Sequence, residues 1–159
     1  MNFLEQLVAE WYAYKGFFVR TNINFGKRPK GGYEGEIDVA AFNPRAKRLI
    51  HIETSSDADS WKERKSRFVR KFTDAERHYR EIFDFEFDSV ERKAIVGFSR
   101  KTVSQVDFGN EIHIVMVPEF IQEITGELGR HSPMQMAIPE GYPLLRAIQF
   151  AIAYGGLRV

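Results

Sequence analysis

Residues 33–55 read YEGEIDVAAFNPRAKRLIHIETS, two apolar runs joined by the Asn-Pro-Arg turn chemistry of residues 43–46. The turn predicts that the runs form a pair of neighbouring strands. Both runs carry carboxylates, which core strands avoid because burying an unpaired charge is costly. Since side chains alternate along a strand, Asp38 and Glu53 can meet at one place. Two oxygen donors at one place suit Mg²⁺ or Mn²⁺.

Outside this stretch, the spacing of apolar residues and the turn residues predict alternating strands and helices. The predicted strands cover 17–25, 33–42, 47–54, 93–98 and 112–117, and the predicted helices cover 2–15, 61–83, 118–128 and 143–154. Three strands before a long helix, followed by helix-connected strands, predict an α/β fold. We expect an αβββαβ core, a mixed sheet flanked by helices, with an extra C-terminal strand and helices. The length of 159 residues fits a single domain, 1–159.

The composition excludes several kinds of site. The chain has no cysteine, so thiolate zinc sites, disulfides and cysteine nucleophiles are ruled out, and we expect a cytoplasmic protein. The net charge of +1 indicates no class of partner. The N-terminus lacks a basic segment followed by an apolar one, so no signal peptide is predicted. The most apolar stretch, 144–154, is shorter than the about 20 residues of a membrane span, and no membrane partner is expected.

The order of the elements and their acidic residues resembles the PD-(D/E)xK nuclease superfamily, which has the restriction-endonuclease-like fold. The residues that carry the resemblance are Glu5, Gly35-Glu36-Ile37-Asp38 and Glu53. The N-terminal part is most similar to the Holliday-junction-resolvase-like branch. In that branch a first-helix glutamate, here Glu5, lies eleven residues before a glycine–aromatic pair, here Gly16-Phe17. The resemblance covers residues 3–72 by motif, and the later strands fit by topology.

The resemblance implies metal-dependent hydrolysis of phosphodiester bonds in nucleic acid, with DNA as the expected substrate. It implies Asp38 and Glu53 as ligands of Mg²⁺ or Mn²⁺, with Glu5 as a third acidic residue of the site. A divalent ion there would neutralise the anionic substrate and lower the pKa of water. The opposing interpretation is that each carboxylate pairs with a Lys or Arg in a buried ion network. Three acids in the family's order favour the metal site over that interpretation.

The lysine of the family's Glu-x-Lys element is replaced by Ser55. In one interpretation the lysine has moved to the following helix, where Lys65 lies about 40° from Trp61 at about 100° per residue. Lys62, nearer the edge of the apolar stripe, is a weaker candidate. In the other interpretation catalysis is lost, and the fold is a nucleic-acid-binding or interaction module. For His51 we favour a hydrogen-bonded core residue over a ligand.

Two basic segments flank the predicted site, and both can contact phosphates. They comprise Lys27, Arg28 and Lys30 in a glycine-rich loop, and Lys62, Arg64, Lys65, Arg67, Arg70 and Lys71 in the predicted long helix. The alternative for the helix is a solvated charged face. No base-reading module is present in the sequence. The last helix, 143–154, is apolar nearly all round, which predicts either burial on the sheet or a homodimer contact.

Overall fold

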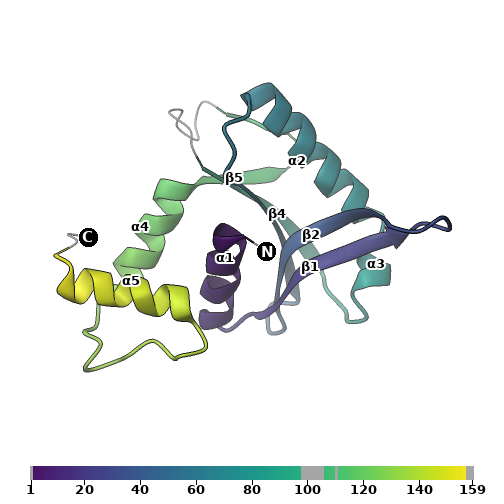
Figure 1. Ribbon diagram of the computed structural model, residues 1–159. Coiled ribbons are helices and arrows are strands. Elements are labelled where there is room, and N and C mark those ends of the chain that lie inside the picture. The colour runs from purple at the N-terminus through teal and green to yellow at the C-terminus, as the bar shows by residue number, and fades with distance from the viewer. Residues whose placement is uncertain (1, 98–105, 110, 157–159) are drawn as a thin grey trace.

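The structure, a computed structural model, describes residues 2–97, 106–109 and 111–156 (Figure 1). The strands are β1 (Phe18–Lys27), β2 (Tyr33–Asn43), β3 (Arg48–Ser55), β4 (Ser89–Val96) and β5 (Ile112–Met116). The helices are α1 (Phe3–Tyr14), α2 (Trp61–Glu76), α3 (Tyr79–Ile82), α4 (Val117–Leu128) and α5 (Pro143–Tyr154). The strands lie in the order β1-β2-β3-β4-β5. The first three pair antiparallel, and β3, β4 and β5 pair parallel. The predicted α/β fold with a mixed sheet between helices is therefore confirmed.

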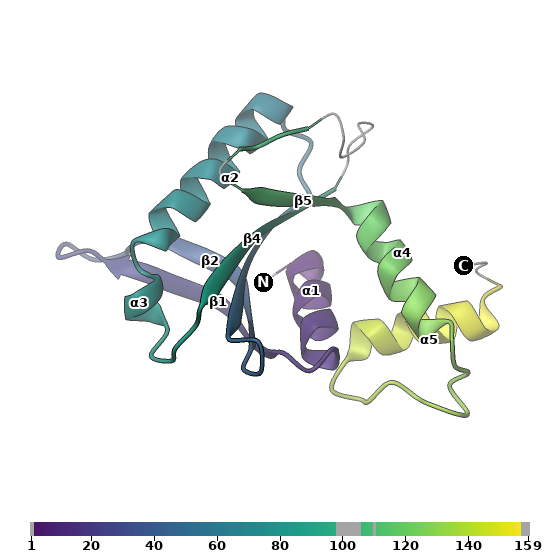
Figure 2. The ribbon, with the colours of Figure 1, turned by 180° about the vertical axis from the view of Figure 1, so that it is seen from behind.

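The two faces of the sheet are covered by different helices (Figures 1 and 2). On one face, α1 and α4 pack over a core that includes Val39, Ile52 and Ile95, and α5 packs against these two helices. On the other face lies α2, whose Phe68 and Phe72 are buried against β4 and β5. In β3, Ile52 points toward the face that carries α1. Because side chains alternate along a strand, the polar residues on either side of it, His51 and Glu53, point toward α2.

Helix α1 begins with a capping box. The side chain of Asn2 accepts hydrogen bonds from the amides of Leu4 and Glu5, and the carboxylate of Glu5 accepts one from the amide of Asn2. The helix is followed by Gly16, whose φ of 87° is the left-handed conformation that ends many helices. Glu5 is thus bonded to the start of its own helix.

The predicted helix over 61–83 is wrong in one respect, because it is interrupted. Helix α2 ends at Glu76, and the short helix α3 begins at Tyr79. The ring of His78, between them, is hydrogen-bonded to Glu81 Oε2 at 3.0 Å and to Glu34 Oε2 of β2 at 3.2 Å. The break therefore ties the end of α2 to the β1–β2 hairpin.

Two C-terminal predictions also need correction. Strand β4 begins at Ser89, four residues before the predicted start, and its predicted end, Phe98, lies outside the described residues. Helix α5 packs on α1 and α4 instead of on the sheet, and it leaves Phe150 and Tyr154 exposed. A homodimer contact through α5 stays a prediction. Within the described residues, no helix has both the length and the apolar character needed to cross a membrane.

Candidate functional site

The candidate site begins where β2 and β3 separate. The pairing of the two strands runs from Asn43 with Arg48 to Val39 with Ile52 and ends there. Past that point, Asp38 Oδ2 accepts a hydrogen bond from the amide of Thr54 at 2.8 Å. A carboxylate thus occupies the place of a backbone acceptor in the opening between the strands.

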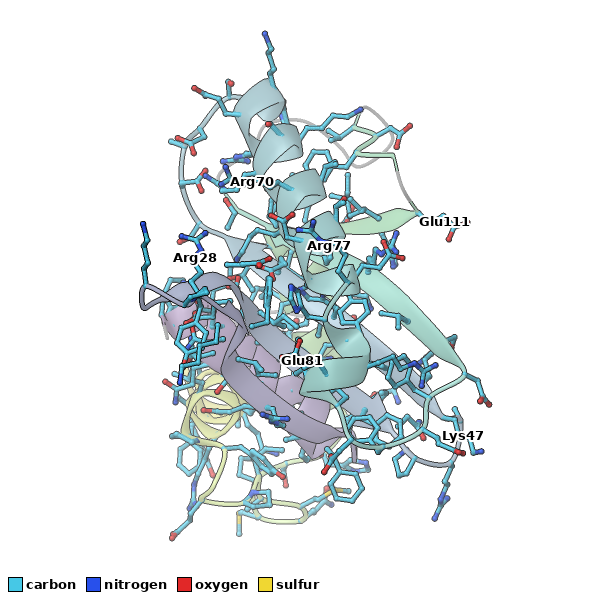
Figure 3. The ribbon with its side chains drawn as sticks, turned by 90° about the vertical axis from the view of Figure 1, so that its right-hand side faces the viewer. Arg28, Lys47, Arg70, Arg77, Glu81 and Glu111 are labelled. Atoms are coloured by element: carbon cyan, nitrogen blue, oxygen red, sulfur yellow. The ribbon has the colours of Figure 1, made fainter. Side chains whose placement is uncertain are left out.

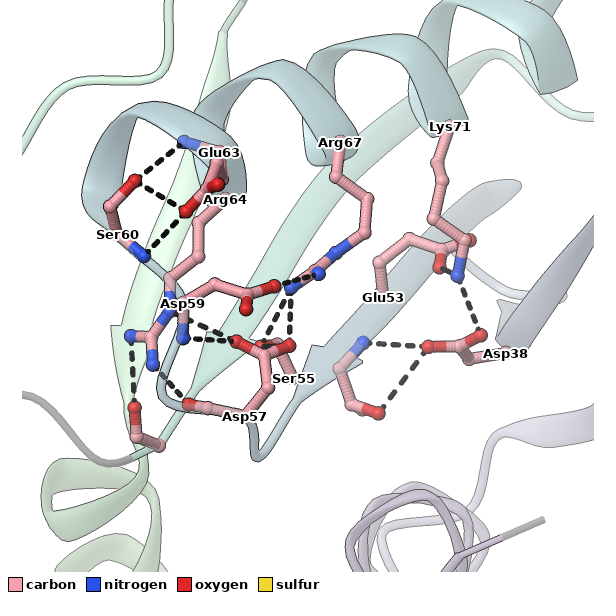
Figure 4. Close-up of polar contacts among 12 residues, drawn as sticks. Asp38, Glu53, Ser55, Asp57, Asp59, Ser60, Glu63, Arg64, Arg67 and Lys71 are labelled. Atoms are coloured by element: carbon pink, nitrogen blue, oxygen red, sulfur yellow. Dashed lines mark hydrogen bonds and ion pairs between the residues drawn. The ribbon is translucent and has the colours of Figure 1, made fainter.

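Glu53 lies beside this opening and points toward α2. Its side chain is fully buried, and Asp38 is only 6% exposed. Lys71, on α2, reaches down to both residues (Figure 4). Its Nζ lies 2.8 Å from Asp38 Oδ1 and forms an ion pair with Glu53 Oε2. One oxygen from each carboxylate therefore converges on a single cation, as the strand pattern predicts for Asp38 and Glu53.

A buried histidine fixes the orientation of Glu53. His51 Nε2 lies 2.6 Å from Glu53 Oε1, and His51 Nδ1 lies 2.6 Å from the hydroxyl of Tyr79. Burial, with the nearby Lys71 and Arg92, lowers the pKa of His51 well below its usual value, so the ring is neutral. A neutral ring that donates from Nε2 accepts from the Tyr79 hydroxyl at Nδ1. The hydrogen bonds from Tyr79 through His51 hold Glu53 Oε1 and leave Glu53 Oε2 for the cation. These contacts agree with the interpretation of His51 as a hydrogen-bonded core residue.

The charges at the site are closely coupled. Burial and the neighbouring Asp38 carboxylate raise the pKa of Glu53 well above its usual value. Burial alone would lower the pKa of Lys71, but the Glu53 and Asp38 carboxylates outweigh burial and raise it. Lys71 is therefore positively charged at neutral pH. Two carboxylates share one monovalent cation, an arrangement with room for further positive charge.

The prediction that Lys65 supplies the cation is wrong. Its Nζ donates to the backbone carbonyl of Asp107 at 3.1 Å, away from the carboxylates. Lys65 and Lys71 lie three residues before and three after the buried Phe68, which is about 60° to either side of it on a helix of about 100° per residue. Helix α2 turns the Lys71 side toward β2 and β3. Lys62, the weaker candidate, is exposed, and its side chain makes no hydrogen bond or ion pair with the described residues.

Ser55, at the usual lysine position, belongs to a separate polar cluster at the start of α2 (Figure 4). Its hydroxyl donates to Asp57 Oδ2 at 2.6 Å and accepts from the guanidinium of Arg67 at 3.1 Å. Arg67 also pairs with Asp57 and with Asp59. Arg67 lies one helical turn before Lys71, and its contacts with Ser55, Asp57 and Asp59 anchor the loop between β3 and α2.

Two predicted site residues have structural roles instead. Arg64 is 2% exposed and donates to the carbonyls of Gly97, at 3.0 Å, and Asp57. A guanidinium buried in this way cannot contact a phosphate, so its prediction as a nucleic-acid contact is wrong. Glu5 is wrong as a site residue, because its carboxylate is bonded to the amide and side chain of Asn2 in the cap of α1. Arg64 falls close to Phe68 on the helical wheel, a signal for burial that its charge masks.

A groove opens beside Lys71, between the β1–β2 hairpin and α2. Its cavity volume is about 510 Å³, and we call it the hairpin groove. The lining comprises Phe25, Arg28, Glu34, Gly35, Glu36, Arg67, Arg70, Lys71 and Asp74. Of the predicted phosphate contacts in the hairpin, Arg28 thus lines the groove, while Lys27 and Lys30 are exposed outside it.

The residues present fit a hard divalent cation. Mg²⁺ is usually bound by one or two carboxylates together with waters and substrate phosphate, and Asp38 and Glu53 supply two such carboxylates. Within the ranges 2–97, 106–109 and 111–156, no group of three or more His, Cys, Asp or Glu side chains is placed to hold a metal. The pair therefore fits a cation that shares its coordination with water and a bound phosphate better than one enclosed by protein ligands.

The chain was compared with known proteins. No family model matches it, and no curated protein matches it. Among solved structures it is similar to a crystal structure described as "Protein of Unknown Function AF1548". The two share 20% sequence identity with a TM-score of 0.55 over 92% of this chain and 78% of that chain. At this identity the similarity supports the α/β fold alone.

Proposed function

We propose that this chain is a metal-dependent nuclease that hydrolyses phosphodiester bonds in nucleic acid, with DNA as the expected substrate. The observation that carries the proposal is the convergence of Asp38 Oδ1 and Glu53 Oε2 on the Nζ of Lys71. Two carboxylates and a lysine are the side-chain set of the PD-(D/E)xK superfamily, which the sequence resembles. Here the lysine comes from α2 instead of β3. We expect the protein to act in the cytoplasm, with which its lack of cysteine is compatible.

Each residue has a distinct role in this proposal. Asp38 and Glu53 would hold Mg²⁺ or Mn²⁺, which supplies positive charge to the phosphodiester and lowers the pKa of water when bound. Lys71 keeps a positive charge, and its side chain is 28% exposed, so it can contact an anionic substrate. The neutral His51 holds one oxygen of Glu53 so that the other remains directed at the cation. The chain thereby places fixed charges around the phosphate before the reaction begins.

The alternative is a catalytically silent nucleic-acid-binding or interaction module of the same fold. The ion pairs themselves favour it, because Lys71 already pairs with both carboxylates. In that case Asp38, Glu53 and Lys71 form a structural network, and divalent ions would not stabilise the protein. Thermal unfolding with and without Mn²⁺ separates the two candidates, since only the nuclease requires a metal at this place.

The direct test is cleavage of labelled branched, single-stranded and duplex DNA and of RNA, with Mn²⁺ or with EDTA. We expect the wild type to cleave at least one substrate in Mn²⁺ and none in EDTA. Asp38→Ala should lower the rate by at least about 100-fold, the order expected when electrostatic stabilisation of a transition state is removed.

The matched control is Asp59→Ala, which removes an exposed carboxylate that pairs with Arg67 outside the site. This variant should cleave at close to the wild-type rate. Equal rates for the wild type and Asp38→Ala, or no Mn²⁺-dependent cleavage of any substrate by the wild type, would refute the proposed activity.

A further inference from the structure

The hairpin groove carries two guanidinium groups that no other side chain neutralises. Arg28 projects from the β1–β2 turn and Arg70 from α2, and both line the groove. Neither side chain has a hydrogen-bond or ion-pair partner among the described residues. Figure 3 shows the two on the same side of the molecule, with Lys47 at the opposite end. Two free guanidiniums in one groove attract an anion, and their fork of donors suits phosphate.

The same groove contains carboxylates, which a surface that binds only phosphate would exclude. Each of Glu34, Glu36 and Asp74 uses one oxygen in a contact with the protein. Glu36 Oε1 accepts from Asn22 Nδ2 at 3.1 Å, and Asp74 Oδ1 accepts from Arg77 at 2.8 Å. Glu34 Oε2 is bonded to His78. The second oxygen of each carboxylate makes no hydrogen bond or ion pair with the described residues. The groove therefore offers oriented acceptors beside free cations.

We propose that the hairpin groove binds one unpaired nucleotide next to the phosphate held at Lys71. Arg28 and Arg70 bind its phosphates, and the carboxylates accept hydrogen bonds from the amino group of its base. A volume of about 510 Å³ is that of a small-ligand site and admits a single nucleotide, not a duplex. A duplex presents its free amino hydrogens inside the major groove, between its two backbones, so a base reaches this lining only when it is unpaired and enters the groove.

This inference rests on the proposed nuclease activity. If the chain is a nuclease, the groove makes a single strand or a splayed end its substrate. It also predicts a base preference. Cytosine presents an N4 amino group that Glu or Asp accepts, whereas thymine has only a carbonyl oxygen at that position. Oligo(dC) should therefore bind more tightly than oligo(dT).

The test is fluorescence anisotropy with labelled dC8, dT8 and a fully paired hairpin duplex, in EDTA so that no cleavage occurs. We expect the wild type to bind dC8 at least about fivefold more tightly than dT8 and more tightly than the duplex. Arg28→Ala and Arg70→Ala should each weaken dC8 binding about five- to tenfold. Each should also reduce the slope of log K against log salt concentration by about 1, as expected when a phosphate contact is lost.

The control is Arg45→Ala, an exposed arginine without a side-chain partner in the β2–β3 turn, at the other end of β2 from the groove. It should leave dC8 binding unchanged. Glu36→Gln tests base recognition, because the amide oxygen must face Asn22 Nδ2 and its NH₂ then points into the groove. This exchange of an acceptor for a donor should abolish the preference for dC8 over dT8.

The inference is overturned if Arg28→Ala and Arg70→Ala bind dC8 like Arg45→Ala, if dT8 or the duplex binds as tightly as dC8, or if Glu36→Gln keeps the preference. These measurements contain no metal and no turnover, so their outcome is independent of the nuclease assay. Loss of the base preference with cleavage intact would remove this inference alone. Intact binding without cleavage by the wild type would remove the nuclease proposal alone.

Discussion

Substituting Lys71 by methionine should have a larger effect on stability than the same substitution at Lys65. Methionine keeps much of the aliphatic stem of lysine and removes the charge. In Lys71→Met the carboxylates of Asp38 and Glu53, 6% and 0% exposed, lose their counter-charge. In Lys65→Met only a hydrogen bond to the carbonyl of Asp107 is lost at an exposed position. The pair of variants compares one charge removed at the site with one removed away from it.

The magnitude follows from the burial of the pair. Removing one partner of a buried ion pair costs about 3–5 kcal/mol. The Lys71 side chain is 28% exposed and Glu53 can take up a proton, so we expect a loss of about 2–3 kcal/mol in the free energy of unfolding. With a urea dependence of about 2 kcal/mol per M, the midpoint falls by about 1–1.5 M. Lys65→Met should change the free energy by less than about 0.5 kcal/mol.

The assay is urea unfolding of the two variants and the wild type in EDTA at pH 7.5 and at pH 5. Burial and Asp38 raise the pKa of Glu53 in the folded protein above its unfolded value. The folded state then binds the extra proton, so the penalty in Lys71→Met should shrink as the pH falls toward 5. Mn²⁺ at pH 7.5 should also restore stability to Lys71→Met, since it supplies the missing positive charge. Equal midpoints for the two variants in EDTA would refute the assigned role of Lys71.

Three further outcomes are expected. Glu5→Gln should lower stability by about 0.5–1 kcal/mol through the helix cap, as measured by urea unfolding, and leave cleavage unchanged; a loss of cleavage would return Glu5 to the site. Arg64→Met should lower stability by about 2–4 kcal/mol, because it leaves the buried carbonyl of Gly97 without a donor, and a neutral effect would contradict the structural role of this arginine. Burial raises the pKa of Tyr12, and contact with Tyr12 raises that of Lys93 although burial alone would lower it. Both folded-state pKa values exceed the unfolded ones, so stability should fall as the pH rises above about 10, and Tyr12→Phe should flatten that fall in urea midpoints measured from pH 8 to 11.

The meeting of Asp38 and Glu53 could be predicted from the sequence because it depends on local rules. The turn at 43–46 joins β2 to β3, and alternation along each strand sets the face of every side chain. Helices α1, α4 and α5 were predictable in the same way, from apolar spacing and from Gly16. Each of these features is determined within about twenty residues of chain.

The identity of the cation depends on tertiary structure and could not be predicted. Lys65 and Lys71 border the same apolar stripe on opposite flanks, at equal angles from Phe68, so the helical wheel treats them alike. The position and tilt of α2 over the sheet decide between them, and long-range packing sets both. The capping role of Glu5, in contrast, could have been predicted from the sequence, because the pattern Asn2-x-x-Glu5 indicates a capping box.

The most direct test of a metal-dependent nuclease site at Asp38, Glu53 and Lys71 is the Mn²⁺-dependent rate of phosphodiester cleavage, measured on one labelled single-stranded substrate for the wild type, Asp38→Asn, Lys71→Met and Lys65→Met. We expect cleavage by the wild type and Lys65→Met at similar rates, and losses of at least about 100-fold in Asp38→Asn and Lys71→Met. Similar rates for Lys71→Met and Lys65→Met, or a wild type that is inactive in Mn²⁺, would contradict this assignment.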